Sequence, residues 1–301
     1  MTDTLTDLGR RPAAPVPEPA VRSRSKPGSG RIRFASAVIG LYVLVAVFGP
    51  WLVGYDPVAT STGDRLLPPG SRTEDGSLAI FGTDQVGQDL LAQVFQGARI
   101  SIAVGVATLL LAGLIGVTVG VVAGWYGRWL DGALMRLADV QLTFPSILLA
   151  IFIAALLGPS VVNVVIVLAI SNWVTFARVA RSQVLVTKNR DFVDATRTLG
   201  ARSWHLVRHC VLPACAAPVL VVATVEIGHV ILAEASLSFL GLGTPSSSPS
   251  WGVTIANGRN YLGDAWWIST IPGICLALLV VSFGLLGDAL RDRFDPKLKN
   301  L

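Results

Sequence analysis

The amino-acid sequence predicts an all-α polytopic membrane protein with about six transmembrane helices. Hydrophobic residues make up 52% of the 301 residues and charged residues only 14%, a composition too apolar for a soluble chain. A bilayer core of about 30 Å needs roughly 20 helical residues per span, so the length allows about six spans with their loops. This composition excludes collagen-like, nucleic-acid-binding and disulfide-stapled secreted proteins. The three cysteines show no C-x-x-C spacing that would indicate a metal site.

Charge-free runs of sequence locate the spans, because a charged side chain in the middle of a membrane is costly. Three runs each hold one predicted span, namely 34–55, 100–127 and 265–287. A longer run, 140–177, exceeds the length of one crossing. Gly158 and Pro159 at its middle predict a tight hairpin of two spans. A further span is expected from about Pro213 to Gly241.

The distribution of lysine and arginine predicts which side of the membrane each loop faces. With these spans, 20 of the 24 Lys and Arg residues fall on one side, and Arg65, Arg72, Arg99 and Arg259 fall on the other. Because cytoplasmic loops carry the excess of positive charge, both termini are predicted to be cytoplasmic and the segment after the first span external. The N-terminal tail is rich in Pro, Arg and Ser and is expected to be disordered.

The cytoplasmic loop after the fourth predicted span carries a motif. From residue 191 it reads DFVDATRTLG, and after nine further residues it continues as CVLP from residue 210. This pattern resembles the EAA signature of permease subunits of bacterial ATP-binding-cassette (ABC) importers: Glu-Ala-Ala, three residues, Gly, nine residues, Ile-x-Leu-Pro. Matches at the family's spacing are Ala195, Gly200, Leu212 and Pro213, whereas Asp194, Thr196 and Cys210 replace Glu, Ala and Ile.

The residues of this loop also have a physical explanation. Asp191 and Asp194 lie near the start of a predicted helix, where carboxylates complement the helix dipole. Gly200 permits a sharp turn, and a second short helix is expected before Pro213 opens the next span. Two short helices that meet at a glycine would form a compact knob. The alternative is an ordinary amphipathic loop whose charges are solvated.

By the resemblance, this knob docks on an ATPase subunit and transmits its closure to the spans. The resemblance assigns ATPase coupling to six residues: Asp194, Ala195, Thr196, Gly200, Leu212 and Pro213.

Further motifs resemble the second permease subunit of dipeptide and oligopeptide importers, the DppC and OppC type. They are FGTDQVGQD from 81, GARIS from 97, FPS from 144, EASLSFLGLG from 234 and GDALRDRFDP from 287. Gln88 departs from the usual Arg of the first motif, and Gly284 stands where Asn is expected. Nickel and some glycan importers share this subunit type, so the motifs are more specific for a permease than for a peptide substrate.

The resemblance implies a type I ABC importer permease fold in an inner membrane. Its implied partners are a second homologous permease, two ABC ATPase subunits, an external substrate-binding protein and membrane lipid, with no nucleic acid. The expected parts are a disordered basic cytoplasmic tail 1–33, the first span with an external segment 34–98, a core permease domain 99–290 that contains the coupling loop 187–213, and a cytoplasmic tail 291–301.

The sequence contains no motif for ATP hydrolysis. A P-loop needs Lys followed by Ser or Thr, and none of the chain's lysines, Lys26, Lys188, Lys297 and Lys299, is followed by either. The chain is therefore predicted to be a permease and not an enzyme, with no cofactor of its own and with ATP and Mg²⁺ on the partner ATPases. A proton-coupled secondary transporter and a non-transporting membrane scaffold remain as alternatives.

Three polar residues of the fifth span are candidates for a translocation path. Glu226 and His229 are one helical turn apart, and Glu234 lies about 80° further round at roughly 100° per residue. All three can point into the bundle. They could line a passage and meet a peptide's ammonium group, form a buried polar cluster that fastens the helix to its neighbours, or relay protons.

Small residues recur on the second span, which indicates close helix packing. They are Gly105, Gly113, Gly116, Gly120 and Gly124. We expect these residues to pack against another permease subunit.

Overall fold

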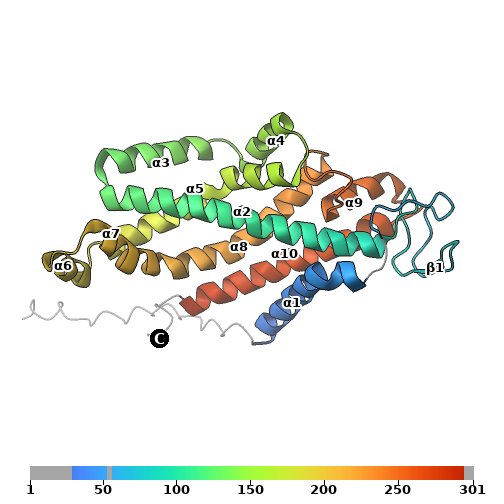
Figure 1. Ribbon diagram of the computed structural model, residues 1–301, viewed down its shortest axis with the longest axis horizontal. Coiled ribbons are helices and arrows are strands. Elements are labelled where there is room, and N and C mark those ends of the chain that lie inside the picture. Colours follow the sequence, from blue (N-terminus) through green and yellow to red (C-terminus); the bar gives the residue numbers. More distant parts are fainter. Residues whose placement is uncertain (1–28, 53–55, 295–301) are drawn as a thin grey trace, which may run out of the picture.

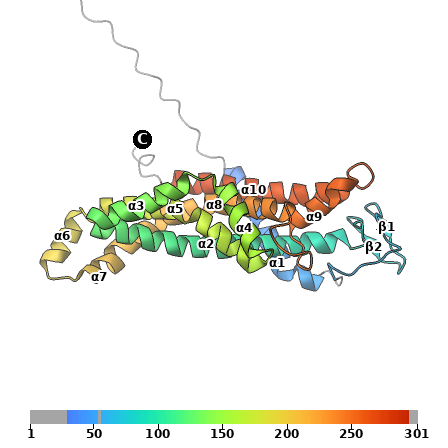
Figure 2. The ribbon, with the colours of Figure 1, turned by 90° about the horizontal axis from the view of Figure 1, so that it is seen from above.

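The computed structural model describes residues 29–52 and 56–294. The described chain is an elongated bundle whose long helices run along one axis (Figures 1 and 2). The helices are α1 (Ser29–Leu52), α2 (Leu90–Tyr126), α3 (Arg128–Leu142), α4 (Ser146–Leu157), α5 (Val161–Thr187), α6 (Asp191–Thr198), α7 (Ser203–Leu206), α8 (Leu212–Phe239), α9 (Trp251–Gly258) and α10 (Trp267–Phe294). A π-helix, η1 (Val207–Val211), joins α7 to α8, and a 3-10 helix, η2 (Arg259–Tyr261), follows α9.

The membrane-spanning character predicted from sequence is confirmed. Five helical stretches of the described chain are long and apolar enough to cross a membrane, and a bent pair, α3 with α4, brings the total to as many as six. Helix α1 begins at Ser29, so the last residues of the tail expected to be disordered are helical. Helix α10 likewise continues to Phe294, into the expected C-terminal tail. The rest of both tails, 1–28 and 295–301, lies outside the described residues.

The expected hairpin over 140–177 has its turn where the sequence places it, but its first arm is not a full span. Gly158 has φ +77° and separates α4 from α5. Helix α4 has only 12 residues, or about 18 Å, against a hydrocarbon core of about 30 Å. It meets α3 at 86°. Pro145 stands at the junction and has no N–H to continue the hydrogen bonds of α3, so the apolar stretch is broken into two helices.

The glycines of α2 pack within the chain, so the expectation that they face another subunit is wrong. A Cβ on Gly116 would lie 2.3 Å from the carbonyl oxygen of Trp173, and one on Gly120 would lie 2.2 Å from that of Ala177. Both oxygens belong to α5. Gly105 instead faces Ile231 of α8. Small residues therefore bring the α2 backbone against α5, as close helix packing in membranes requires.

The segment 56–89 forms a small folded cap at one end of the bundle (Figure 1). Strand β1 (Ser71–Arg72) pairs antiparallel with β2 (Leu78–Ala79). The buried Asp84 accepts hydrogen bonds from the backbone N–H groups of Val86 and Gln88, both at 2.9 Å, and from Gln93 Nε2 of α2 at 2.8 Å. The cap is thus fixed to the start of α2.

Two tryptophan side chains connect the elements at this end of the bundle through hydrogen bonds and packing. The indole of Trp267, at the start of α10, donates to the carbonyl oxygen of Thr83 in the cap at 3.1 Å. Trp251, at the start of α9, is fully buried and donates to the carbonyl oxygen of Val94 in α2 at 3.0 Å. Both side chains combine a large apolar surface with a satisfied N–H donor. The cap, α2, α9 and α10 therefore form one packed unit.

The packing of α2 on α5 predicts a position-specific effect of added methyl groups. Gly120→Ala should destabilise the protein by about 1–3 kcal/mol, because its Cβ would overlap the α5 backbone. The matched control is Gly113→Ala, whose Cβ would meet only Phe176 Cδ1 at 4.0 Å. The thermal unfolding midpoints of the two detergent-purified variants measure the difference. Equal midpoints would show that the close contact contributes nothing to stability.

Candidate functional site

Helices α6 and α7 form the predicted knob, at the end of the bundle opposite the cap (Figures 1 and 2). Helix α6 ends in a Schellman motif. The Gly200 N–H donates to the carbonyl oxygen of Arg197 at 2.9 Å, and the Ala201 N–H donates to that of Thr196 at 3.3 Å. Gly200 has φ +89°, a left-handed conformation that glycine adopts without strain. The glycine of the sequence motif therefore sets the angle between the two helices.

The knob presents an apolar surface. Phe192, Leu199 and Trp204 are 50%, 88% and 69% exposed, whereas Val193 and Leu206 are buried beneath them. Three large apolar side chains exposed on two short helices are unusual for a surface in contact with water and are typical of a binding surface. We call these three residues, with the exposed Asp194 and Ala195 between them, the coupling surface.

The knob is tied to the end of α2. The Arg197 guanidinium lies over the ring of Trp125, 5.8 Å from its centroid. Lys188 Nζ donates to the carbonyl oxygen of Gly124 at 2.7 Å. Arg197 also pairs with Asp194 at 3.2 Å within α6. Contacts of α6 and of the preceding turn with α2 therefore link the coupling surface to the helix that reaches the cap.

Pro213 lies in the first turn of α8, as predicted, but the helical rod extends further back along the chain. The helix is continuous from Ser203 to Phe239 through η1. The N–H of Leu212 donates to the carbonyl oxygen of Val207, a π-type bond. A proline inside a helix removes one N–H donor and crowds the preceding turn, and a widened π turn relieves this crowding. Leu212 and Pro213 thus belong to the spanning helix, whereas Asp194, Ala195, Thr196 and Gly200 lie together in the knob.

The three polar residues of α8 do not form one cluster. Glu234 is fully buried, and its carboxylate accepts hydrogen bonds from Ser101 Oγ of α2 at 2.9 Å and from Ser238 Oγ at 2.7 Å. The His229 side chain is 68% exposed and that of Glu226 is 17% exposed, with Nδ1 and Oε2 3.7 Å apart. The expectation that all three point into the bundle is therefore wrong for His229. Glu234 fastens α8 to α2, whereas His229 is exposed and Glu226 is partly buried beside it.

An apolar groove lies further along α8, nearer the cap, and begins at Leu232. Its lining comes from α8, α9 and α10, and it encloses about 340 Å³. From α8 it includes Leu232, Ser236 and Leu240. At about 100° per residue, these positions share a face of α8 with His229. One face of α8 thus carries a polar pair, then an apolar groove, and then the end of the helix.

Sequence reasoning missed a set of polar contacts between α3 and α5. Asp131 forms a bidentate ion pair with Arg181, with bonds of 2.5 and 2.6 Å. The Trp173 indole donates to Gln141 Oε1 at 2.7 Å. Because a charge inside a span is costly, charged residues on two facing helices indicate pairing, but the expected hairpin gave no reason to place α3 beside α5.

Comparison with known families and structures agrees with this geometry. A family model described as "Binding-protein-dependent transport system inner membrane component" matches residues 116–300. A second, described as "N-terminal TM domain of oligopeptide transport permease C", matches residues 33–69. The chain belongs to the ABC importer permeases. This membership confirms the predicted resemblance and the prediction of a permease subunit and not an enzyme.

Relatives of this permease are named for peptide transport. A putative peptide transport system permease protein of Brucella suis is 40% identical over 98% of this chain and 96% of its own length. A di/tripeptide transport system permease protein of Pseudomonas aeruginosa is 41% identical over 86% of each chain. A chain of the MetNI methionine ABC transporter superposes with a TM-score of 0.54 at 18% identity, covering 66% of this permease and 95% of that chain. The structural likeness confirms the predicted permease fold.

The hydrogen bonds of Glu234 predict a stability cost for their removal. Ser101→Ala should lower stability by about 1 kcal/mol, because the buried carboxylate loses a donor from α2. The matched control is Ser236→Ala, whose hydroxyl bonds only to the Leu232 carbonyl of its own helix at 2.8 Å. Thermal unfolding in detergent compares the two variants with the parent chain. A larger loss for Ser236→Ala would contradict the fastening role of Ser101.

Proposed function

We propose that this permease is one half of the translocation path of an ATP-driven importer of short peptides in the inner membrane. Relatives named for di/tripeptide, D,D-dipeptide and glutathione transport, which are 37–41% identical, support a peptide substrate. Nickel or a glycan, which importers of the same class carry, is the alternative cargo, and direct uptake assays distinguish them.

The proposed complex contains a second homologous permease, two ABC ATPase subunits that hold ATP and Mg²⁺, and an external substrate-binding protein. The excess of Lys and Arg supports a cytoplasmic location for both termini and for the coupling loop 187–213. The cap 56–89 then faces outward with the start of α2. Lipid covers the remaining apolar helix faces.

The observation that carries the proposal is the coupling surface. Phe192, Leu199 and Trp204 present exposed apolar area on a knob whose second helix continues directly into α8. A partner that presses on this surface moves α8 without an intervening flexible loop. Closure of the ATPases would in this way shift the membrane helices between inward-open and outward-open arrangements.

In the proposed path, Glu226 and His229 face the passing peptide. His229 is exposed and Glu226 is partly buried beside it, where a second permease would enclose them between the two subunits. A carboxylate in a membrane is costly unless it meets a partner or a water-filled cavity. The ammonium group of a peptide is such a partner. The carboxylate of Glu234 already accepts hydrogen bonds from two serines, so in this proposal it does not contact the peptide.

Substitution of Gly200 tests whether ATP drives uptake and whether ATP hydrolysis by the partner subunits is coupled to uptake through the knob. In proteoliposomes that hold the co-purified complex, uptake of a labelled dipeptide should require ATP and survive an uncoupler. Gly200→Pro should abolish ATP-dependent uptake while ATP hydrolysis continues, because proline has neither the N–H nor the positive φ of this turn.

The matched control for this experiment is Gly200→Asn, which tolerates a positive φ and should retain most uptake. Uptake that collapses with an uncoupler but survives loss of ATP would instead favour a proton-coupled transporter. Wild-type coupling in Gly200→Pro would refute the role assigned to the knob.

Glu226 tests the proposed path. Glu226→Gln should lower the initial rate of dipeptide uptake about tenfold, because the passing ammonium group loses a charge-assisted contact. Recovery of the assembled complex should stay unchanged. The matched control is Thr224→Val on the same helix, whose hydroxyl bonds only to the Leu220 carbonyl at 2.8 Å. If uptake and assembly fall together, Glu226 has a structural role and does not line the path.

A further inference from the structure

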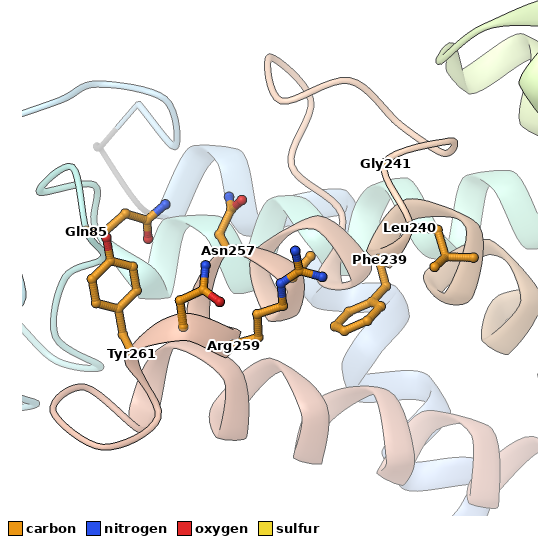
Figure 3. A pocket seen from close by; sticks show the side chains of 9 residues that line it. Gln85, Phe239, Leu240, Gly241, Asn257, Arg259 and Tyr261 are labelled. Carbon is orange, nitrogen blue, oxygen red and sulfur yellow. The ribbon is translucent and has the colours of Figure 1, made fainter.

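A polar pocket lies at the end of α8, beside the cap (Figure 3). It encloses about 460 Å³, a volume typical of a site for a small molecule. The cap contributes Gln85, the end of α8 contributes Phe239 and Leu240, and α9 with η2 contributes Asn257 and Arg259. Two of the family motifs contribute lining residues, namely Gln85 from the motif at 81 and Phe239 with Leu240 from the motif at 234, but no role was assigned to this pocket. We call it the outer pocket.

The outer pocket contains an acceptor and a donor without partners. The side-chain oxygen Oε1 of Gln85 is buried and has no hydrogen-bond partner among the described residues. A buried carbonyl oxygen without a donor is costly, so a ligand N–H would be favourable there. Over residues 29–52 and 56–294, no carboxylate lies within ion-pair distance of Arg259. Gln85 lines the pocket, so a rotation of its side chain would present this oxygen to a ligand, near the cationic donor of Arg259.

Arg259 is held in place by an aromatic ring. Its guanidinium lies over Phe239, 5.7 Å from the ring centroid, a stacking that leaves the N–H edges of the group free. Figure 3 shows Gln85 and Tyr261 at one end of the pocket, with Asn257 and Arg259 between them and Phe239. Among the described residues that line the pocket, none is acidic. A free, planar cation in such a setting is suited to a bidentate contact with a carboxylate.

The two arginines of the cap, unlike Arg259 of η2, donate hydrogen bonds to backbone carbonyl groups. Arg65 Nε donates to the carbonyl oxygen of Gln85 at 2.7 Å, and Arg72 Nη1 donates to that of Gly76 at 3.4 Å. Each of these guanidiniums stabilises a turn of the cap. Arg259 differs from both because its one described partner is an aromatic face.

The outer pocket is continuous with the face of α8 that carries the proposed path. Phe239 and Leu240 line both this pocket and the apolar groove beside it. The groove reaches Leu232, which lies about one helical turn of α8 from His229. A molecule that enters at the outer pocket therefore meets, in order, a cation with amides, an apolar groove and a carboxylate.

We propose that the outer pocket binds the carboxylate end of a short peptide on its way into the path. Arg259 holds the C-terminal carboxylate, Gln85 Oε1 accepts a peptide N–H, and Asn257 provides a further amide contact. This inference rests on the proposed function, because it takes a zwitterionic peptide as the cargo. The ammonium end of the same peptide is then free to move toward Glu226.

A labelling experiment tests binding directly and without transport. Cys210, Cys215 and Cys275 are replaced by alanine, and Asn260→Cys places a thiol at the lining of the outer pocket in the nanodisc-reconstituted complex, at a residue with no assigned contact to the peptide. Millimolar dialanine should slow maleimide labelling of this thiol about tenfold, a retardation that needs a Kd well below the peptide concentration. Dialanine amide, which has no carboxylate, should not slow it. Addition of Arg259→Gln should abolish the protection.

Each opposite result overturns the proposal. Absence of protection by dialanine means that the pocket does not bind peptide. Equal protection by dialanine and its amide means that Arg259 does not recognise a carboxylate. Protection by dialanine that persists in Arg259→Gln also means that Arg259 does not recognise the carboxylate.

A transport assay distinguishes a failure of this inference from a failure of the proposed function. In proteoliposomes with the binding protein, Arg259→Gln should lower dialanine uptake about tenfold, and Arg259→Lys should restore part of it. Arg72→Gln, outside the pocket, is the matched control and should leave uptake unchanged. The concentration of binding protein that half-saturates ATP hydrolysis should stay constant.

The transport results distinguish three failures. A parent complex that takes up no peptide refutes the proposed function, whatever the labelling shows. Unchanged uptake in Arg259→Gln refutes the outer pocket as a step of the path. A several-fold rise in the half-saturating concentration of binding protein in Arg259→Gln means that the guanidinium binds an acidic side chain of that protein and not the peptide.

Discussion

The close approach of α2 to α5 is the contact on which the rest of the bundle depends. In a bilayer, lipid tails are as apolar as the side chains, so helices associate through tight packing and not through the hydrophobic effect. Gly116 and Gly120 remove the side chains that would separate the two backbones. Because α2 has 37 residues and runs from the cap to the knob (Figure 1), its position relative to α5 also sets the positions of both ends.

The two ends of the bundle are joined to α2 by different interactions. At the cap, Gln93 of α2 donates to the buried Asp84 and accepts from Thr254 of α9 at 3.1 Å. At the knob, the contacts are an arginine over Trp125 and a lysine on the carbonyl of Gly124. A satisfied buried network is rigid, whereas exposed charge contacts contribute little energy and rearrange readily. The cap is thus held to α2 by a buried network, and the knob by a part-buried hydrogen bond and by an arginine that is half exposed.

Helix α8 connects the coupling surface to the outer pocket along one continuous rod. The knob helix runs through η1 into the span, and the far end of that span lines the pocket. A π turn at Val207–Val211 is the irregular point of this rod, and π turns are frequent at functional sites. A displacement of the knob would therefore reach the path by movement of a packed helix, with Glu234 and Ser101 as its fastening to α2.

Sequence patterns predicted the spans and the knob because their causes are local. Charge-free length, helix-dipole carboxylates and the positive φ of Gly200 act within a few residues, and each prediction agrees with the structure. The hairpin arm failed for a different reason. The absence of charged residues over 140–177 shows only that the run is apolar. It does not show that Pro145 divides the run into a helix beside α5 and a short helix of 12 residues.

The sequence by itself determined the class of protein, the number of apolar segments and the location of the knob, because composition and spacing are properties of the chain alone. Only the tertiary structure decided what each polar or small residue contacts. The spacing of glycines on α2 is the same whether these residues pack against α5 or against another subunit. Glu226 and Glu234 likewise have identical side chains, and the sequence does not distinguish their surroundings. Their surroundings differ because folding places Ser101 beside the carboxylate of Glu234 and the exposed His229 beside that of Glu226.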